Sequence, residues 1–168
     1  MKRKVDLIVV HCSATKPELS RTLDAEEVRR WHTLPKSQNG RGWSDIGYHY
    51  FIKHDGTIEE GRPIRRSGAH VKGFNRRSIG ICYSGGLDEN GVPKDTRTQA
   101  QKTALKIILK KLIGLKDHPE IEISPVVQVV GHRDLSPDKN GDGKISKNEW
   151  LKDCPSFDAK TEYFNLID

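Results

Sequence analysis

Apolar residues along the chain gather in short continuous runs, separated by longer polar stretches. Residues 5–11 are β-branched and almost continuously apolar, which predicts a central strand covered on both faces. Residues 78–83 and 126–130 have the same character and predict two more buried strands. The first of these runs ends in His11, and the last is followed closely by His132.

A further strand and a hairpin are predicted in the middle of the chain. Residues 46–53 read as a strand that would place Tyr48, Tyr50 and Ile52 on one face. Asp55 and Gly56 supply the turn residues of a hairpin into residues 58–61.

Two segments have the spacing of amphipathic helices. Residues 23–32 predict a short surface helix that begins near Asp24. Residues 98–115 predict a longer helix with one apolar side, formed by Ala104, Ile107, Ile108, Leu112 and Leu115. Because strands and helices interleave, the expected fold is α/β, a single domain over residues 1–168 with a central mixed β-sheet flanked by helices.

Composition and charge narrow the function classes. With 34% hydrophobic residues, a net charge of +6 and a mean hydropathy of −0.70, the chain is typical of a soluble globular protein. The positive charge is spread along the chain without a Lys/Arg block, so neither nucleic acid nor a membrane is the expected partner. The expected oligomeric state is a monomer. The first apolar run is too short for a signal peptide, which predicts synthesis in the cytoplasm.

Three residues far apart in the sequence form a candidate metal site. His11 and His132 follow buried-looking strands, and Cys154 comes later in the chain. Two imidazoles and one thiolate are a ligand set of catalytic zinc, which keeps its fourth position open. Three separated ligands form no local motif, so this spacing alone is equally compatible with packed histidines and a buried thiol.

Five short blocks appear in one order along the chain: HCSAT at 11–15, WSDIGYHY at 43–50, GAHVKGFN at 68–75, SIGI at 78–81 and KDCPSFD at 152–158. In this the sequence resembles the zinc-dependent N-acetylmuramoyl-L-alanine amidases, small phage lysozyme-type enzymes that share the fold of peptidoglycan recognition proteins. The resemblance implies hydrolysis of the amide between N-acetylmuramic acid and L-alanine in bacterial peptidoglycan. With no signal peptide visible, the sequence fits a phage or prophage endolysin that is made in the cytoplasm and acts on the cell wall after release. A wall-recycling or effector amidase would have the same sequence features.

The same resemblance implies roles for individual residues. Zinc would be held by His11, His132 and Cys154. Proton transfer and stabilisation of the oxyanion would fall to Tyr48 and Lys152. Substrate contacts would come from Trp43, His70 and Asn75, whereas the remaining histidines are expected to be structural or superficial: His32, His49, His54 and His118.

Residues 138–149, between the second and third expected zinc ligands, match the calcium loop of an EF-hand. The small phage enzymes have a shorter connection at this place, so the loop is an insertion relative to them. Oxygen-bearing side chains stand at positions 1, 3, 5, 9 and 12, and glycine stands at position 6. The expected calcium ligands are Asp138, Asn140, Asp142 and Glu149 directly, Lys144 through its carbonyl, and Ser146 directly or through water. Calcium would be structural and zinc catalytic; the alternative is a solvated turn.

Two other functions remain open on the sequence. A non-catalytic peptidoglycan-binding module would share the fold. A cysteine hydrolase would use Cys154 as nucleophile and His132 as base, with Asp134 orienting the histidine. Nucleic-acid binding has only the net charge in its favour.

Overall fold

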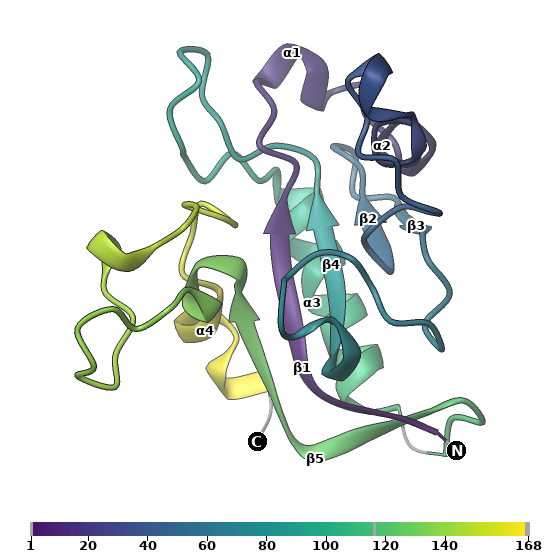
Figure 1. Ribbon diagram of the computed structural model, residues 1–168, viewed down its shortest axis with the longest axis vertical. Coiled ribbons are helices and arrows are strands. Elements are labelled where there is room, and N and C mark those ends of the chain that lie inside the picture. The colour runs from purple at the N-terminus through teal and green to yellow at the C-terminus, as the bar shows by residue number, and fades with distance from the viewer. Residues whose placement is uncertain (1, 116, 167–168) are drawn as a thin grey trace.

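One mixed β-sheet forms the centre of the computed structural model, which describes residues 2–115 and 117–166 (Figure 1). The remaining residues of the expected domain 1–168 lie outside the described part. The strand order is β3-β2-β4-β1-β5. The strands are β1 (Arg3–Cys12), β2 (Tyr50–Ile52), β3 (Ile58–Glu60), β4 (Ser78–Tyr83) and β5 (Ile121–Gly131).

Strand β1 is central, as its continuous apolar run predicts. It pairs in parallel with β4 on one side and with β5 on the other, while β2 pairs in parallel with β4 and antiparallel with β3. Val10 stands opposite Ile81 of β4 and Gly131 of β5. The carboxyl ends of these strands therefore meet at one edge of the sheet.

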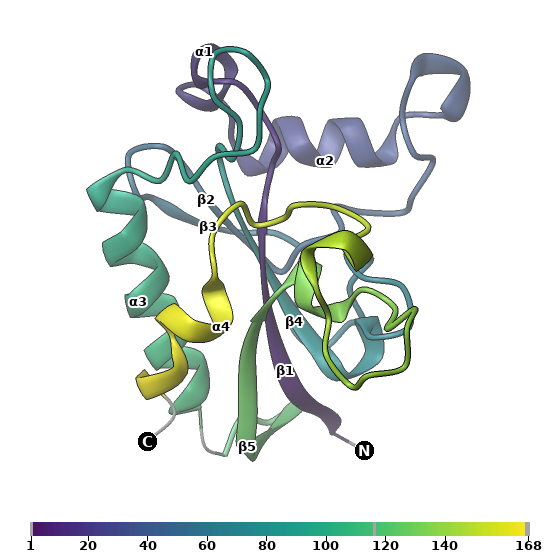
Figure 2. The same cartoon turned by 90° about the vertical axis from the view of Figure 1, so that its left-hand side faces the viewer.

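Helices lie on both faces of the sheet (Figure 2). They are α1 (Pro17–Ser20), α2 (Ala25–Thr33), α3 (Gln99–Ile113) and α4 (Ala159–Glu162). The carboxylate of Asp24 caps α2 by accepting from the N–H of Glu27, and Thr98 and Gln101 form a capping box at the start of α3. Short 3₁₀ turns occupy Lys36–Gln38, Asn75–Arg77, His132–Leu135, Lys147–Glu149 and Phe164–Leu166.

Alternation along β1 divides the core between the two faces. Ile8 and Val10 belong to the large apolar cluster that includes the buried side of α3. Leu7 and Val9 point the other way and pack with Val71 and Val130. Because His11 continues the second set, its imidazole emerges on the face of the sheet away from α3.

The predicted strand over residues 46–53 is shorter than expected, because only Tyr50–Ile52 forms β2. The expectation that Tyr48 shares a face with Tyr50 and Ile52 is wrong. Tyr48 packs with the cluster containing Phe51, whereas Tyr50 and Ile52 belong to the large cluster beside α3. The chain before β2 is not in the sheet, so the two-residue alternation does not extend to Tyr48.

Two predicted burial patterns also need correction. Ile107 is 58% exposed, because the buried side of α3 follows Gln101, Ala104, Leu105, Ile108, Leu109 and Leu112 instead. Val126 is 73% exposed, and it lies where the pairing of β5 with β1 breaks register, between Ile123 and Gln128. Such an irregularity interrupts the regular alternation of side chains, so the apolar run alone does not predict which of its residues are buried.

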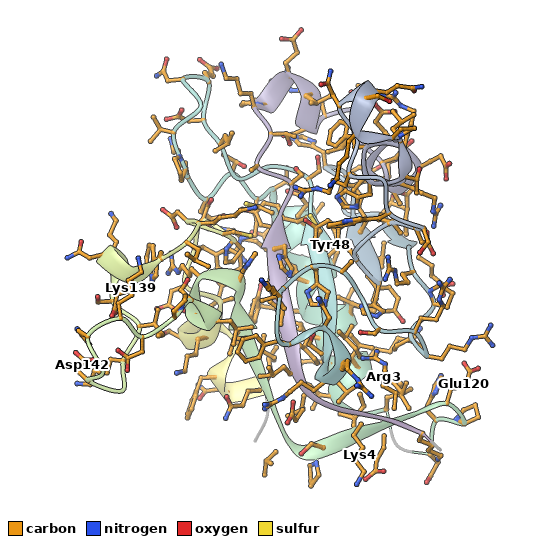
Figure 3. The ribbon with its side chains drawn as sticks, viewed as in Figure 1. Arg3, Lys4, Tyr48, Glu120, Lys139 and Asp142 are labelled. Carbon is orange, nitrogen blue, oxygen red and sulfur yellow. The ribbon has the colours of Figure 1, made fainter. Side chains whose placement is uncertain are left out.

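The segment between His132 and Cys154 leaves the sheet as a long excursion. Lys139 and Asp142 lie on a loop that projects from the body, well away from Tyr48 beside the central strands (Figure 3). Among the described residues, no helix is long and apolar enough to cross a membrane.

Candidate metal centre and active site

The parallel pairing of β1 and β5 brings two histidines together. Because Val10 stands opposite Gly131, the next residues, His11 and His132, leave the same sheet edge side by side. Their ring centroids are 4.9 Å apart, with the rings inclined at 67°. Strand register thus brings together two of the three expected zinc ligands.

Cys154 reaches the same place from the returning excursion. Its carbonyl oxygen accepts a hydrogen bond from the N–H of Arg133 at 2.8 Å, and the hydroxyl of Tyr83 donates to the next carbonyl, that of Pro155, at 2.7 Å. The Cys154–Pro155 peptide bond is cis. These contacts hold the segment against the ends of β4 and β5, with Cys154 buried.

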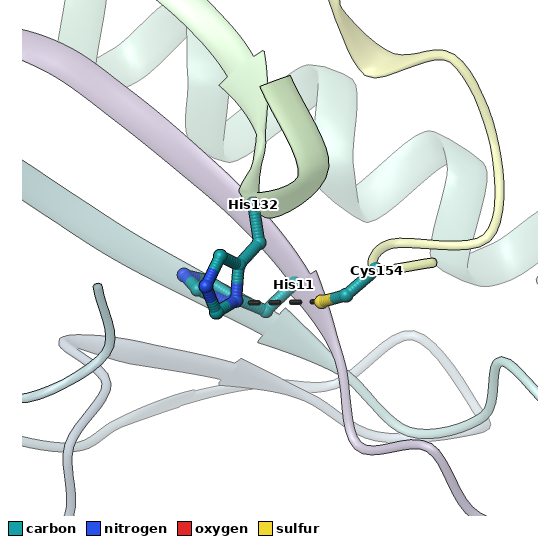
Figure 4. Close-up of side chains that lie close together, drawn as sticks. All are labelled: His11, His132 and Cys154. Carbon is teal, nitrogen blue, oxygen red and sulfur yellow. Dashed lines mark hydrogen bonds between the residues drawn. The ribbon is translucent and has the colours of Figure 1, made fainter. Parts of the chain in front are cut away.

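The three side chains form a compact donor set. Cys154 Sγ lies 3.7 Å from His11 Nδ1, and one donor atom from each of His11, His132 and Cys154 lies within 4.8 Å of the others (Figure 4). Ligands of a tetrahedral zinc ion, bound at about 2.0–2.3 Å, stand roughly 3.3–3.8 Å apart. The donor types and their spacing therefore fit zinc.

Electrostatics keep the two imidazoles in the neutral state that a cation needs. Burial and the nearby charge of Lys152 lower the pKa of His132 to about 4, and burial, His70 and His132 lower the pKa of His11 well below its usual value. Both imidazoles are consequently neutral at pH 7, with a lone pair available. The contact with Cys12 and burial raise the pKa of the Cys154 thiol, so a divalent cation is the partner that stabilises its thiolate.

These donors line a pocket of about 390 Å³. Tyr48 lies beside His11, with ring centroids 5.1 Å apart, and burial raises the pKa of its phenol well above 10, so it stays a proton donor at neutral pH. Lys152 lines the pocket with an exposed side chain. The structure thus brings both predicted catalytic residues to the predicted zinc ligands.

The three predicted substrate contacts differ in their placement. Trp43 lines the pocket and packs on His32 with ring centroids 4.9 Å apart. His70 also lines the pocket, but both of its ring nitrogens have protein partners, His11 and Ser78. The Oδ1 of Asn75 accepts from the backbone N–H groups of His70 and Val71, so Asn75 holds the loop that carries His70.

Sequence reasoning missed His32 and Arg41, which line the same pocket. His32 is buried, and its Nδ1 accepts from the N–H of Gly47 at 3.0 Å, which leaves its Nε2 as the remaining polar atom. The sequence did contain one indication that His32 is buried: it follows Val28 by four residues and therefore lies on the same, buried face of α2. His49, expected to be structural, is buried between the N–H of Gly80 and the carbonyl of Arg66.

The geometry does not support a cysteine nucleophile. Asp134, the expected orienting carboxylate, accepts instead from the backbone N–H of Gly131 at 2.7 Å. The raised pKa of Cys154 also disfavours a free thiolate. A metal ligand is therefore the better description of Cys154.

In the excursion loop, Glu149 is only 4% exposed, and its carboxylate accepts from the N–H groups of Lys139, Asn140 and Ser146. These bonds lower the pKa of Glu149 to about 2. Asp138 likewise accepts from two glycine N–H groups, those of Gly141 and Gly143. Among the described residues, the His11, His132 and Cys154 group is the one compact metal-type cluster, so calcium in this loop stays a prediction.

A mixed sheet with an open pocket and a His-His-Cys donor set at the carboxyl edge of its parallel strands is the arrangement that a metal-dependent hydrolase would need. Residues 1–148 match the N-acetylmuramoyl-L-alanine amidase family, to which the chain belongs. The expectation of an amidase acting on bacterial peptidoglycan is thereby confirmed. Lys152 and Cys154 lie beyond the matched residues, so their roles depend on the geometry described above.

Phage proteins are similar to the chain over most of its length. The endolysin of Escherichia phage T7 is 37% identical, over 95% of this chain and 85% of the relative. The endolysin of Enterobacteria phage T3 is 38% identical, over 92% of this chain and 83% of the relative.

Solved structures have the same fold. The amidase LysC from Clostridium intestinale superposes with a TM-score of 0.62 at 23% identity, covering 96% of this chain and 83% of that one. Bumblebee peptidoglycan recognition protein SA gives 0.64 at 22% identity, covering 96% and 81%. The expected α/β fold with a mixed sheet is confirmed.

Proposed function

We propose that the protein is a zinc-dependent N-acetylmuramoyl-L-alanine amidase that holds zinc through His11, His132 and Cys154. The observation that carries the proposal is the convergence of these three donors within 4.8 Å on the floor of an open pocket, in a chain of the amidase family. Zinc, when bound, supplies Lewis-acid activation of water and of the scissile carbonyl near neutral pH.

The chain's own residues supply the remaining chemistry. The ammonium group of Lys152, on the exposed side of the pocket, faces the negative charge that develops on the carbonyl oxygen. The phenol of Tyr48 remains protonated and donates a hydrogen bond at the same centre. Trp43 and His32 form an aromatic wall along which an extended stem peptide and a sugar ring can lie.

The setting proposed for this activity is the bacterial cell wall. Endolysins of phages T7 and T3 are similar to nearly the whole chain, which supports a lytic enzyme made in the cytoplasm and acting on the wall after release. We propose further that it acts as a single domain and as a monomer, because the site is completed by residues of one chain.

We also propose that the loop over residues 138–149 binds calcium. Support comes from the EF-hand spacing of its oxygen ligands and from Glu149, which stands at the twelfth position. The loop connects to the zinc site through Arg133, whose guanidinium stacks on Trp150 at 4.1 Å and pairs with Asp153 at 3.2 Å. Order in the loop would thereby steady the segment that carries Lys152 and Cys154.

The direct test is mass spectrometry of purified peptidoglycan after digestion by the zinc-loaded protein. We expect free stem peptides that begin with L-alanine, together with glycan strands that have lost their peptides. Retained binding to the wall without these products would instead identify a non-catalytic peptidoglycan-binding module. A His132→Ala variant assayed in parallel controls for contaminating amidases.

A further inference from the structure

Behind the metal site, His11 is linked to a second buried histidine. The Nε2 of His11 lies 2.9 Å from Nδ1 of His70, and the Nε2 of His70 lies 3.2 Å from the hydroxyl oxygen of Ser78. His70 is 9% exposed and Ser78 is fully buried. A chain of three polar side chains thus runs from the metal site into the protein interior.

A metal bound at Nδ1 of His11 would determine where the protons lie in this row of hydrogen bonds. The Nδ1 of His11 is the atom that faces Cys154, so a metal at this site needs the lone pair of Nδ1. The proton of neutral His11 must then be on Nε2, from which it is donated to Nδ1 of His70. His70 in turn carries its own proton on Nε2 and donates it to Ser78.

The position of His70 is built into the fold. A side chain at Gly80 of β4 would come within 2.7 Å of the His70 ring, and one at Gly68 would come within 2.5 Å of it. Asn75 accepts from the backbone N–H of His70 at 2.8 Å. The two glycines leave the space that the imidazole fills, and Asn75 holds the backbone of His70, so the ring is closely packed where it meets His11.

We propose that His70 is a positioning residue for the metal site: it selects the Nε2–H tautomer of His11 and fixes the ring so that Nδ1 is presented to zinc, with Ser78 as the terminal partner. The proposal rests on the proposed zinc site and gives His70 a role different from substrate contact. A residue that hydrogen-bonds to a metal-ligating histidine raises metal affinity because it orients the ligand before the metal binds. Losing such a residue typically lowers the metal affinity about 10–100-fold.

The test is zinc affinity, measured by competition with a chromophoric chelator in the complete protein. His70→Phe removes the acceptor while keeping a planar ring, and we expect its zinc dissociation constant to rise about 10–100-fold. His70→Asn places an oxygen near the position of Nδ1, so it should recover much of the lost affinity. His49→Phe is the control for changing a buried neighbour. His49 is also buried and packs beside His70, with ring centroids 5.9 Å apart, but it hydrogen-bonds to Gly80 and Arg66 rather than to His11.

Wild-type zinc affinity in a folded His70→Phe protein would overturn the proposal, as would an equal loss in His49→Phe. If His70→Phe does not fold, Ser78→Ala tests the far end of the His11–His70–Ser78 row of hydrogen bonds. An unchanged zinc affinity in that variant would also overturn the proposal. Failure of the wild type to bind zinc would instead reject the zinc site itself. If the wild-type protein binds zinc and releases amidase products, but the His70 variants keep wild-type zinc affinity, only the role proposed for His70 is rejected.

Discussion

The Sγ of Cys154 lies 3.7 Å from Nδ1 of His11, although the two residues are 143 positions apart in the chain. No single element brings them together. The parallel pairing of β1 and β5 places His11 beside His132. The backbone N–H of Arg133, the residue after His132, then donates to the carbonyl of Cys154 and holds the segment that carries Cys154 against this sheet edge. The metal site is consequently a product of tertiary structure, and its ligands depend on the folded sheet.

Cys154→Ser should abolish zinc retention while the protein stays folded. A neutral hydroxyl replaces a thiolate, and the remaining two imidazoles bind zinc far more weakly. We expect metal content after gel filtration to fall to background and amidase activity to fall at least about 100-fold. Cys82→Ser is the matched control, because Cys82 is buried on β4 outside the donor set, and it should retain one zinc per chain.

Lys152→Met should lower turnover without loss of zinc. The side chain keeps its length but loses the charge that faces the oxyanion, for which about 10²–10³-fold in kcat is a typical cost. Steady-state kinetics on a soluble muropeptide and zinc analysis of the same sample check this. Lys160→Met, an equally exposed change outside the pocket, should have wild-type kcat. Equal zinc loss and activity loss in Lys152→Met would show a structural role instead.

The zinc-free protein should lose stability as the pH falls from about 6.5 to 4. Burial lowers the pKa of His32, His49 and His132 to about 4 in the folded state, against about 6.5 when unfolded. In this window the unfolded chain binds more protons than the folded protein, so the free energy of unfolding decreases as the pH is lowered. Each unit of pKa difference is worth about 1.4 kcal/mol before solvent screening is discounted. Above pH 6.5 this contribution is fully present.

Urea unfolding of the chelator-treated protein at pH 7.5, 6 and 5 measures this dependence. The pKa values of His11 and His70 are lowered as well, so both add to the same dependence. His49→Gln removes one of these buried imidazoles, and the difference in stability between pH 7.5 and pH 5 should shrink accordingly. Stability that does not change across this range would contradict the assignment of neutral buried histidines.

Much of the fold was predictable because its local signals are strong. The continuous apolar run before His11 predicted β1, Asp24 predicted where α2 begins, and the helical spacing from residue 98 predicted α3. The direction of Tyr48 was not predictable, because the alternation rule applies only within a strand and β2 begins at Tyr50. The contact between His70 and His11 joins residues from separate segments, and nothing in either local sequence indicates it.

The loop over residues 138–149 offers the last prediction, a calcium-dependent rise in thermal stability that requires Glu149. Without calcium, the Glu149 carboxylate already accepts hydrogen bonds from Lys139, Asn140 and Ser146. Glu149→Gln should therefore lower the melting temperature even in chelator, because an amide replaces one accepting oxygen and leaves backbone donors unpaired. The diagnostic quantity is instead the additional shift produced by calcium, which follows mass action.

In zinc-loaded wild type we expect millimolar calcium to raise the melting temperature by several degrees, and in Glu149→Gln by far less. Glu89→Gln, an exposed acid in another loop, should respond like the wild type. Holding zinc constant separates the two metals, since a general chelator would remove both. A wild-type melting temperature that does not respond to calcium would leave the loop a solvated turn closed by Glu149. A response in wild type accompanied by tighter zinc retention would show that order in the loop reaches the segment bearing Cys154, to which the Arg133–Trp150 contact connects it.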